Sequence, residues 1–195
     1  MESVRSNGRR ERKRAILMRR VQEIAVRRFG EGGFGGVTVE EIAAEADVAP
    51  ITIYRNFGTK ERLVLWDEFD PPILDEIERR LPGARPLEAV RGALAALLDE
   101  VYAREAPMAL ARASLIEREP SLMAAASLES RGFAAAIAER IRATGTPDFQ
   151  ARVLAEAAVA ALAAAVTEWE RRGGRTPLGA LIDQAFAALG SGGAA

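Results

Sequence analysis

The chain has 195 residues, a formal net charge of −1, and neither cysteine nor histidine. Its length suffices for one or two domains with a hydrophobic core, and its composition excludes disulfides, thiolate zinc sites and catalysis by a histidine base. Residues 1–30 nevertheless hold ten basic and three acidic side chains, whereas residues 63–195 hold 14 basic and 19 acidic ones. A basic head on an acidic body favours a polyanion as the partner of the head.

The first 30 residues predict a basic arm and then an amphipathic helix. Residues 1–11 are rich in arginine, and we expect them to form a solvated, disordered arm. A helix is predicted from about Arg12 to Gly30, because apolar residues recur there at helical spacing and glycines follow them. Its apolar stripe consists of Leu17, Val21, Ile24, Ala25 and Phe29.

A second helix is predicted to begin after Thr38. Thr38 and Glu41 have the spacing of a capping box, in which each side chain binds the backbone N–H of the other residue. This helix is expected to end near Ala46, and Asp47 is expected to form the turn that follows it.

A third helix is predicted from Pro50, a position that needs no backbone N–H, to about Asn56. Thr59 is expected to cap a fourth helix carrying Leu63, Leu65, Trp66 and Phe69. Beyond Asp70, prolines precede further amphipathic stretches and indicate helix starts. The expected helices are Pro72–Leu81, Pro86–Glu105, Pro107–Glu117, Pro120–Thr144, Pro147–Arg172 and Pro177–Leu189. No strand periodicity is present, so the sequence predicts an all-α fold of about ten helices.

The second and third helices have the pattern of a helix-turn-helix, which places its second helix in the DNA major groove. In the third helix, Ile53 and Phe57 lie four residues apart and are expected to face the core. The residues left to face the groove are Ala49, Pro50, Ile51, Thr52 and Arg55. Arginine can bind guanine through two hydrogen bonds, and threonine can contact a thymine methyl group.

Phosphate contacts are predicted at three further residues, Thr38, Tyr54 and Lys60. We place Lys60 in the first turn of the fourth helix, where the helix dipole disfavours a cation unless a phosphate binds there. The alternative is a helical hairpin whose aromatic residues are simply core, and we adopt it for Phe57.

Residues Phe29 to Lys60 resemble the N-terminal domain of the TetR family of transcriptional regulators. The positions that match the family pattern are Phe29, Gly33, Phe34, Thr38, Val39, Ile42, Ala43, Ala46, Val48, Thr52, Tyr54, Phe57 and Lys60. Two positions depart from it, because Asp47 replaces a turn glycine and Ala49 replaces a capping serine.

The resemblance implies a homodimeric, sequence-specific DNA-binding regulator, usually a repressor, that leaves a palindromic operator when a small-molecule effector binds the C-terminal domain. It divides the chain into a disordered arm (1–11), a helix-turn-helix DNA-binding domain (12–58), a ligand-binding and dimerisation domain (59–189) and a disordered tail (190–195).

The last two helices carry stripes of small and apolar residues that would suit a bundle of four helices from two chains. The dimer residues predicted from them are Leu154, Ala158, Ala161, Leu162, Ala165, Trp169, Leu181, Ile182, Ala185 and Phe186. The same stripes could instead pack inside one chain, and the pattern alone does not decide between the two.

A ligand pocket is less distinct in the sequence. The candidate lining residues are Trp66, Phe69, Leu97, Tyr102, Met108, Arg112, Met123, Phe133 and Ile137. Arg112 lies in an apolar segment and could bind an anionic group of an effector, or could pair with Glu105 or Glu117. The segments Arg112–Leu122 and Ala151–Leu154, with Trp169, resemble actinobacterial members of the family that bind acyl-CoA-like ligands.

We expect no cofactor, no catalytic site and no metal. The most apolar run, Ala157–Val166, has ten residues, fewer than the roughly 20 that a membrane-spanning helix needs, so we expect a cytoplasmic protein. The alternatives from other classes are a helical enzyme that uses carboxylates or tyrosine, and a helical protein-interaction or small-molecule-binding module without DNA binding. The latter would leave the basic head unexplained.

Overall fold

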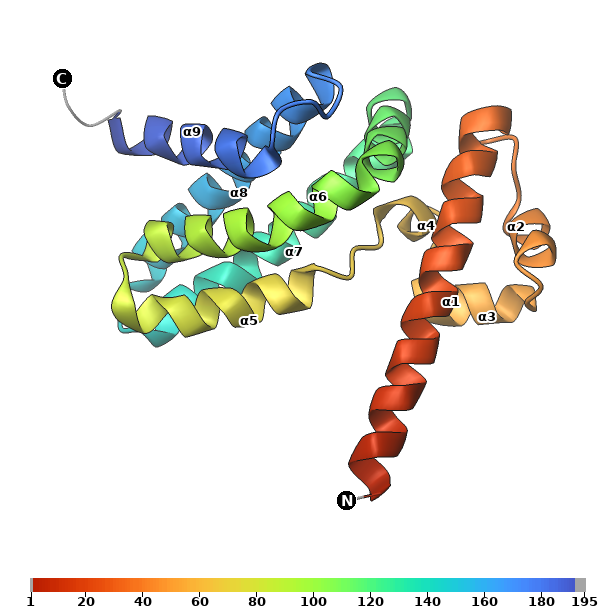
Figure 1. The fold of residues 1–195 in the computed structure, drawn as a ribbon, viewed down its shortest axis with the longest axis horizontal. Coiled ribbons are helices and arrows are strands. Elements are labelled where there is room, and N and C mark those ends of the chain that lie inside the picture. The colour runs from red at the N-terminus through yellow and green to blue at the C-terminus, as the bar shows by residue number, and fades with distance from the viewer. Residues whose placement is uncertain (1, 192–195) are drawn as a thin grey trace. The chain divides into compact units, whose positions relative to one another are not determined.

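The computed structural model describes the backbone of residues 2–191 and the side chains of residues 12–99, 102 and 104–190. Over residues 2–191 it contains helices and turns without a strand, which confirms the all-α prediction. The elements, labelled in Figure 1, are α1 (Glu2–Gly32), α2 (Val39–Glu45), α3 (Pro50–Phe57), α4 (Arg62–Leu65), α5 (Asp70–Arg80), the 3-10 helix η1 (Leu81–Gly83), α6 (Pro86–Arg118), α7 (Pro120–Ala143), α8 (Asp148–Arg171) and α9 (Leu178–Ser191).

The chain folds into two compact units. The first unit comprises Met1–Glu68 and Ala111–Ala125, and the second comprises Phe69–Leu110 and Ala126–Ala195. This division differs from the predicted boundary after residue 58, because Leu63, Val64 and Leu122 are fully buried in the core of the first unit.

The core of the first unit forms where α2 and α4 pack against α1 and α3 packs against α2 (Figure 1). α1 contributes Met18, Val21, Ala25 and Phe29, each at most 4% exposed. The residues that meet this stripe are Ile42, Ala43, Ala46, Ile53, Phe57, Leu63 and Val64. Periodicity predicted Val21, Ala25 and Phe29 correctly, whereas Met18 and Val64 were not predicted. Leu17 and Ile24 of the predicted stripe are only half-buried.

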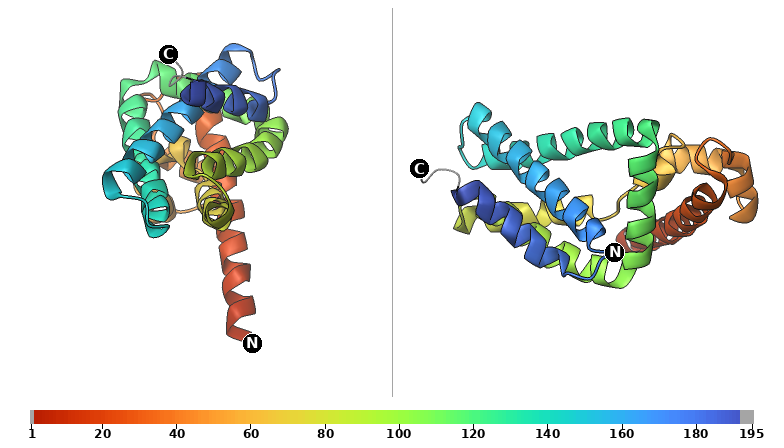
Figure 2. Two further views of the ribbon diagram at one scale, coloured as in Figure 1. Left: turned by 90° about the vertical axis from the view of Figure 1, so that its left-hand side faces the viewer. Right: turned by 90° about the horizontal axis from the view of Figure 1, so that it is seen from above.

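Both ends of the described chain are more helical than predicted. α1 continues back to Glu2 as one unbroken helix (Figure 2), through the segment expected to be a disordered arm. Arginine and glutamate are good helix formers, and a helix that is already anchored extends at little cost per residue. At the other end α9 runs to Ser191, so Gly190 is helical, and the rest of the predicted disordered tail, residues 192–195, lies outside the described residues.

The fourth helix is much shorter than predicted. α4 covers only Arg62–Leu65, and Trp66 has the non-helical angles φ −53° and ψ 126°. Gln22 of α1, which is 7% exposed, donates from Nε2 to the carbonyls of Val64 at 3.2 Å and of Trp66 at 2.8 Å. This buried amide binds the carbonyls at the end of α4. The only sequence signal for these hydrogen bonds was a glutamine among apolar neighbours.

α6 consists of two helical segments that meet at a kink, which confirms the predicted helices Pro86–Glu105 and Pro107–Glu117. It runs from Pro86 to Arg118 and is kinked at Glu105, where φ is −110° and ψ is 17°. Pro107 lies within the helix and causes the kink, because proline lacks the N–H that the helix ladder needs and its ring clashes with the preceding turn.

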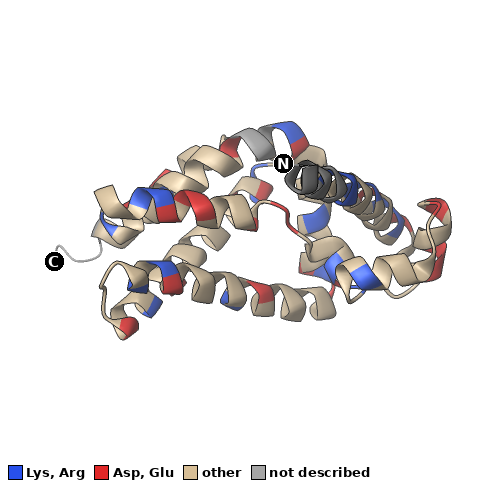
Figure 3. Ribbon diagram, turned by 90° about the horizontal axis from the view of Figure 1, so that it is seen from below, with Lys and Arg blue, Asp and Glu red and all other residues tan. Residues whose placement is uncertain are grey.

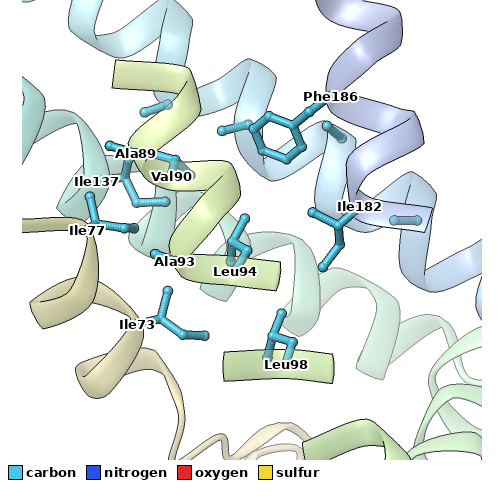
Figure 4. Close-up of a cluster of buried hydrophobic side chains, with 14 of the residues drawn as sticks. Ile73, Ile77, Ala89, Val90, Ala93, Leu94, Leu98, Ile137, Ile182 and Phe186 are labelled. Carbon is cyan, nitrogen blue, oxygen red and sulfur yellow. The ribbon is translucent and has the colours of Figure 1, made fainter. Parts of the chain in front are cut away.

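The core of the second unit joins α5, α6, α7, α8 and α9 (Figure 4). Ile77 of α5, Leu94 of α6, Ile137 of α7 and Ile182 of α9 are at most 1% exposed. Polar contacts fix the helix ends: Asp99 of α6 accepts a hydrogen bond of 3.1 Å from the amide of Gly179, in the first turn of α9. Such a bond satisfies one of the free N–H groups at a helix start.

α8 has the length and the mean hydropathy, 1.5 over 18 residues, of a membrane-crossing helix. This differs from the prediction, which counted only the ten-residue run Ala157–Val166. Six residues of α8 are buried in the second unit: Ala151, Ala155, Ala158, Ala161, Ala165 and Trp169. Burial of this kind is what the core helix of a globular domain requires.

Candidate nucleic-acid interface

The turn between α2 and α3 has the geometry that the sequence predicted. Asp47 has φ 53°, and it is the only residue other than glycine with a positive φ in the part of the chain that the structure describes. Ala49 occupies the N-cap of α3 without a side-chain hydrogen bond, and Pro50 is the first residue of the helix. The turn therefore forms even though glycine and a capping serine are both missing.

α3 has one buried and one exposed face. Ile53 and Phe57 are 1% and 2% exposed, as predicted, and Phe57 packs edge-on against Trp66 with ring centroids 6.1 Å apart. On the opposite face Ile51 is 71% and Tyr54 is 43% exposed. Of the other predicted groove residues, Ala49 and Arg55 are exposed, while Pro50 and Thr52 are half-buried.

Asn56 fixes the end of α3, and sequence reasoning missed it. Its Nδ2 donates to the carbonyl of Thr52 at 2.7 Å, and its Oδ1 accepts from Nε of Arg14 on α1 at 2.8 Å. Arg14 thus couples the basic first helix to the exposed helix. The only sequence signal for Asn56 was its place near a helix end, where asparagine commonly bonds to nearby backbone groups.

The capping box at Thr38 is present and already satisfied. Glu41 accepts from the Thr38 amide at 2.7 Å and from its hydroxyl at 2.8 Å, and the Glu41 amide donates to the Thr38 hydroxyl at 3.2 Å. These bonds, the backbone one first, hold the pKa of the Glu41 carboxyl below its ordinary value. A phosphate could bind Thr38 only by displacing that carboxylate, so the phosphate contact predicted there stays a prediction.

Lys60 lies outside α4, whose N-cap is Glu61, so its predicted place in the first turn of that helix is wrong. Its ammonium donates to the carbonyl of Phe34 and lies 4.7 Å and 5.3 Å from the ring centroids of Phe34 and Phe29. A cation over aromatic faces is held electrostatically. Since an ammonium has three donors, others remain for a phosphate.

Figure 3 marks the basic and acidic residues of the chain, and the basic residues of the first unit differ in whether they have a partner within it. Arg27 and Arg28 of α1 form ion pairs with Glu45 and Glu41 of α2 and hold these two helices together. By contrast, five exposed basic residues of this unit show no hydrogen bond or ion pair to any described residue: Arg12, Lys13, Arg20, Arg55 and Arg118. These cations remain available to an anionic partner.

The predicted pocket residues divide between the two units. Trp66, Arg112 and Met123 belong to the first unit and the other six to the second. Ile137 is fully buried in the second core, and Met123 is 52% exposed. Arg112 donates to the carbonyl of Leu65 at 3.5 Å, and no ion pair with Glu105 or Glu117 occurs in the described part of the chain.

The cavities described next contain none of the predicted pocket residues in their linings. A cavity of about 370 Å³ is lined by Arg85, Leu87, Glu88, Arg91, Asp183, Phe186, Ala187 and Gly190. Another of about 400 Å³ is lined by Arg85, Pro86, Leu87, Thr144, Gly145, Thr146, Pro147, Gln150 and Leu154. Arg91 and Asp183 form an ion pair in the first cavity, so its charges already compensate each other.

The stripes predicted as a dimer surface are core residues, and the alternative that they pack inside one chain is the correct one. Seven of the ten residues are 0–7% exposed within the chain: Ala158, Ala161, Ala165, Trp169, Leu181, Ile182 and Phe186. Leu154, Leu162 and Ala185 are half-buried against the same cluster. The small residues let α8 and α9 approach each other closely, and Trp169 packs edge-on against Tyr102 with ring centroids 5.0 Å apart.

Known sequences match both parts of the chain. Residues 23–65 match the family model for bacterial regulatory proteins of the tetR family, and residues 84–194 match the model of the MftR C-terminal domain. The HTH-type transcriptional regulator TcmR of Streptomyces glaucescens is 35% identical over an alignment of 127 residues, and the match covers 60% of this chain. The match spans 56% of TcmR, little more than half of that relative.

Known structures share the fold. FadR of Thermus thermophilus, a TetR family transcriptional repressor solved with lauroyl-CoA, is 24% identical with a TM-score of 0.56 and covers 88% of this chain and 92% of its own. FadR of Bacillus halodurans is 22% identical with a TM-score of 0.58, covering 89% and 97%. FadR of Bacillus subtilis, solved with stearoyl-CoA, is 21% identical with a TM-score of 0.53, covering 89% and 97%.

The family matches and the helix-turn-helix geometry agree. α2 and α3 lie within the N-terminal match, and α6 to α9 lie almost wholly within the C-terminal one, which spans more than half of the chain. The chain therefore belongs to the TetR family of bacterial transcriptional regulators.

Proposed function

We propose that this chain is a repressor that binds a palindromic DNA operator as a homodimer and leaves it when a small-molecule effector binds the C-terminal unit. The observation that carries the proposal is α3, whose outward face holds Arg55, Tyr54 and Ile51 free of the core while Ile53 and Phe57 anchor the helix from beneath. That arrangement lets a helix enter the major groove without unfolding any part of its own unit. A cytoplasmic location follows from this role.

The groove contacts divide by chemistry. Arg55 is exposed and shows no hydrogen bond or ion pair to a described residue, so it can bind guanine O6 and N7 with both arms of its guanidinium. The Tyr54 hydroxyl and the ammonium of Lys60 suit phosphate oxygens, which position the helix without reading the sequence. Thr52 is half-buried, so we propose only a weaker base contact for its hydroxyl.

For the effector we propose an amphipathic anion of the acyl-CoA class. Two structural relatives were solved with lauroyl-CoA and stearoyl-CoA, and the second unit is built from aliphatic side chains that could part around an acyl chain. Purified protein titrated with acyl-CoAs of increasing chain length should lose operator binding at micromolar ligand. If free CoA displaces the DNA equally well, the acyl chain is not what the protein recognises.

For the homodimer we propose the outward faces of α8 and α9 in place of the buried stripes. Phe149 and Val153 of α8 are 74% and 49% exposed. Ala160, Ala163 and Ala164 continue the same face of α8, and Ala180 and Ala187 lie exposed on α9. Small residues on adjacent helices allow the close approach that a four-helix bundle with two-fold symmetry needs.

DNA binding tests the function directly. The full chain should bind the DNA upstream of its own gene, with an affinity that falls about 100-fold or more between 50 and 200 mM salt, because the cations release counterions from the phosphates. Arg55→Ala should weaken binding to that DNA more than to unrelated DNA. If the protein binds neither duplex at low salt, it is not a DNA-binding regulator.

A further inference from the structure

The outward face of α3 begins with three side chains that have no hydrogen-bonding group. Ala49 is exposed, Pro50 is half-buried, and Ile51 is 71% exposed. A single exposed isoleucine on a protein surface is ordinary. Here, however, the apolar run occupies the N-terminal turn of α3, and the N-terminal residues of a recognition helix are the ones that contact base edges.

The chemistry of the major groove offers one partner for such a surface. Guanine, cytosine and adenine display only hydrogen-bond donors and acceptors there, whereas thymine also displays its C5 methyl group. An isoleucine placed against a donor or acceptor would remove water from it and return no hydrogen bond, which is unfavourable. Ile51 placed against a methyl group buries apolar surface on both sides.

We infer that Ile51 is a specificity-determining residue that reads a thymine methyl group in each half of the operator. The inference rests on the proposed DNA-binding function and adds to it a base and the atom by which that base is recognised. Isoleucine is suited to this role, since a β-branched side chain in a helix keeps essentially one rotamer and loses little freedom on contact. The Arg14–Asn56–Thr52 hydrogen bonds hold the helix itself in place.

The position of Arg55 fixes where the thymine lies relative to a second base. Ile51 and Arg55 are four residues apart on one face of α3, so their Cβ atoms are about 6 Å apart. Successive base pairs are about 3.4 Å apart along the duplex. The half-site should therefore contain a thymine and a guanine one or two base pairs from each other, contacted by Ile51 and Arg55.

The test removes only the methyl group. The full chain is first used to select its preferred duplex from a randomised library, and each thymine of that duplex is then replaced by deoxyuridine, which keeps the pairing and the O4 acceptor. One thymine per half-site should be sensitive, with a loss of about fourfold in affinity for each methyl removed. In Ile51→Ala the same replacement should change affinity less than about twofold.

Matched controls separate this contact from other effects. Ile16→Ala removes another exposed isoleucine, 60% exposed on α1, and should keep full sensitivity to deoxyuridine. Equal melting temperatures should show that both variants are folded. If no thymine is sensitive, or if Ile51→Ala keeps the sensitivity, the inference is wrong while the proposed function stands. If the chain selects no duplex at low salt, the proposed function fails and this inference fails with it.

Discussion

Lys60 and Tyr54 were both predicted to bind phosphate, but their surroundings differ. The ammonium of Lys60 contacts the Phe34 carbonyl and two aromatic rings, whereas Tyr54 projects from α3. Lys60→Met should therefore lower the free energy of unfolding by about 1–3 kcal/mol, and Tyr54→Phe should change it by less than about 0.5 kcal/mol. Urea denaturation measures both. A Lys60→Met variant as stable as the parent would mean that the ammonium serves DNA alone.

Asp47 bears a conformational cost that glycine would not. Its φ of 53° lies in the left-handed region, which disfavours side chains by roughly 1–2 kcal/mol, less for aspartate. Asp47→Gly should raise the free energy of unfolding by up to about 1 kcal/mol, and Asp47→Ala should lower it by a similar amount. In thermal denaturation, the melting temperature of Asp47→Gly should lie above that of the parent and the melting temperature of Asp47→Ala below it. If both variants shift the melting temperature by the same amount in the same direction, the aspartate carboxylate, rather than the backbone conformation, decides stability here.

At the scale of elements, the start of α2 couples stability to pH. Hydrogen bonds from the Thr38 amide and hydroxyl keep the pKa of Glu41 lower in the folded than in the unfolded chain. The carboxylate therefore adds stability above its unfolded pKa of about 4.3, and this contribution is lost as pH falls through the folded pKa. The parent should be more stable than Glu41→Gln from pH 5 to 8, and the difference should shrink below about pH 4.

Chemical denaturation at a series of pH values measures this difference. Glu40→Gln, which removes the same charge from the same turn without touching the Thr38–Glu41 hydrogen bonds, is the control for the loss of charge alone. If the difference in the free energy of unfolding between the parent and Glu41→Gln stays constant down to pH 3, the capping carboxylate does not change its protonation on unfolding in that range.

The elements that could be predicted from sequence are those whose cause is local. The Thr38–Glu41 capping box, the turn at Asp47 and the burial of Ile53 and Phe57 each depend on residues a few positions apart. The end of α4 could not be predicted in this way, because it is held by Gln22, more than 40 residues earlier. Lys60 was misplaced for the same reason, since its partners Phe29 and Phe34 come from α1 and the loop after it.

At the scale of the whole molecule, the sequence pattern of α8 and α9 did not show which apolar face packs in the core of the same chain and which could contact a second chain. Both faces of α8 are rich in alanine, so a stripe of small residues fits a core as well as a dimer surface. Burial decides, because a single chain already covers Ala158, Ala161 and Ala165. Any dimer surface on these helices must then use the residues that one chain leaves exposed.

Val153 tests this surface. It is 49% exposed on the same face of α8 as Phe149 and Ala160, so Val153→Arg would place like charges near the two-fold axis without disturbing the chain's own core. Sedimentation velocity at micromolar concentration should show a dimer for the parent and a monomer for Val153→Arg. Operator affinity should fall by about 100-fold or more, since one half-site alone then holds each chain and the gain from linked binding is lost.

Leu128→Arg is the matched control, because Leu128 is a similarly exposed apolar residue, 69% exposed, on α7. It adds the same charge to the same unit and should leave both the dimer and the operator affinity intact. A Val153→Arg protein that still sediments as a dimer would move the interface away from this face of α8. A monomer that still binds the full operator tightly would show instead that half-site recognition does not depend on pairing through these helices.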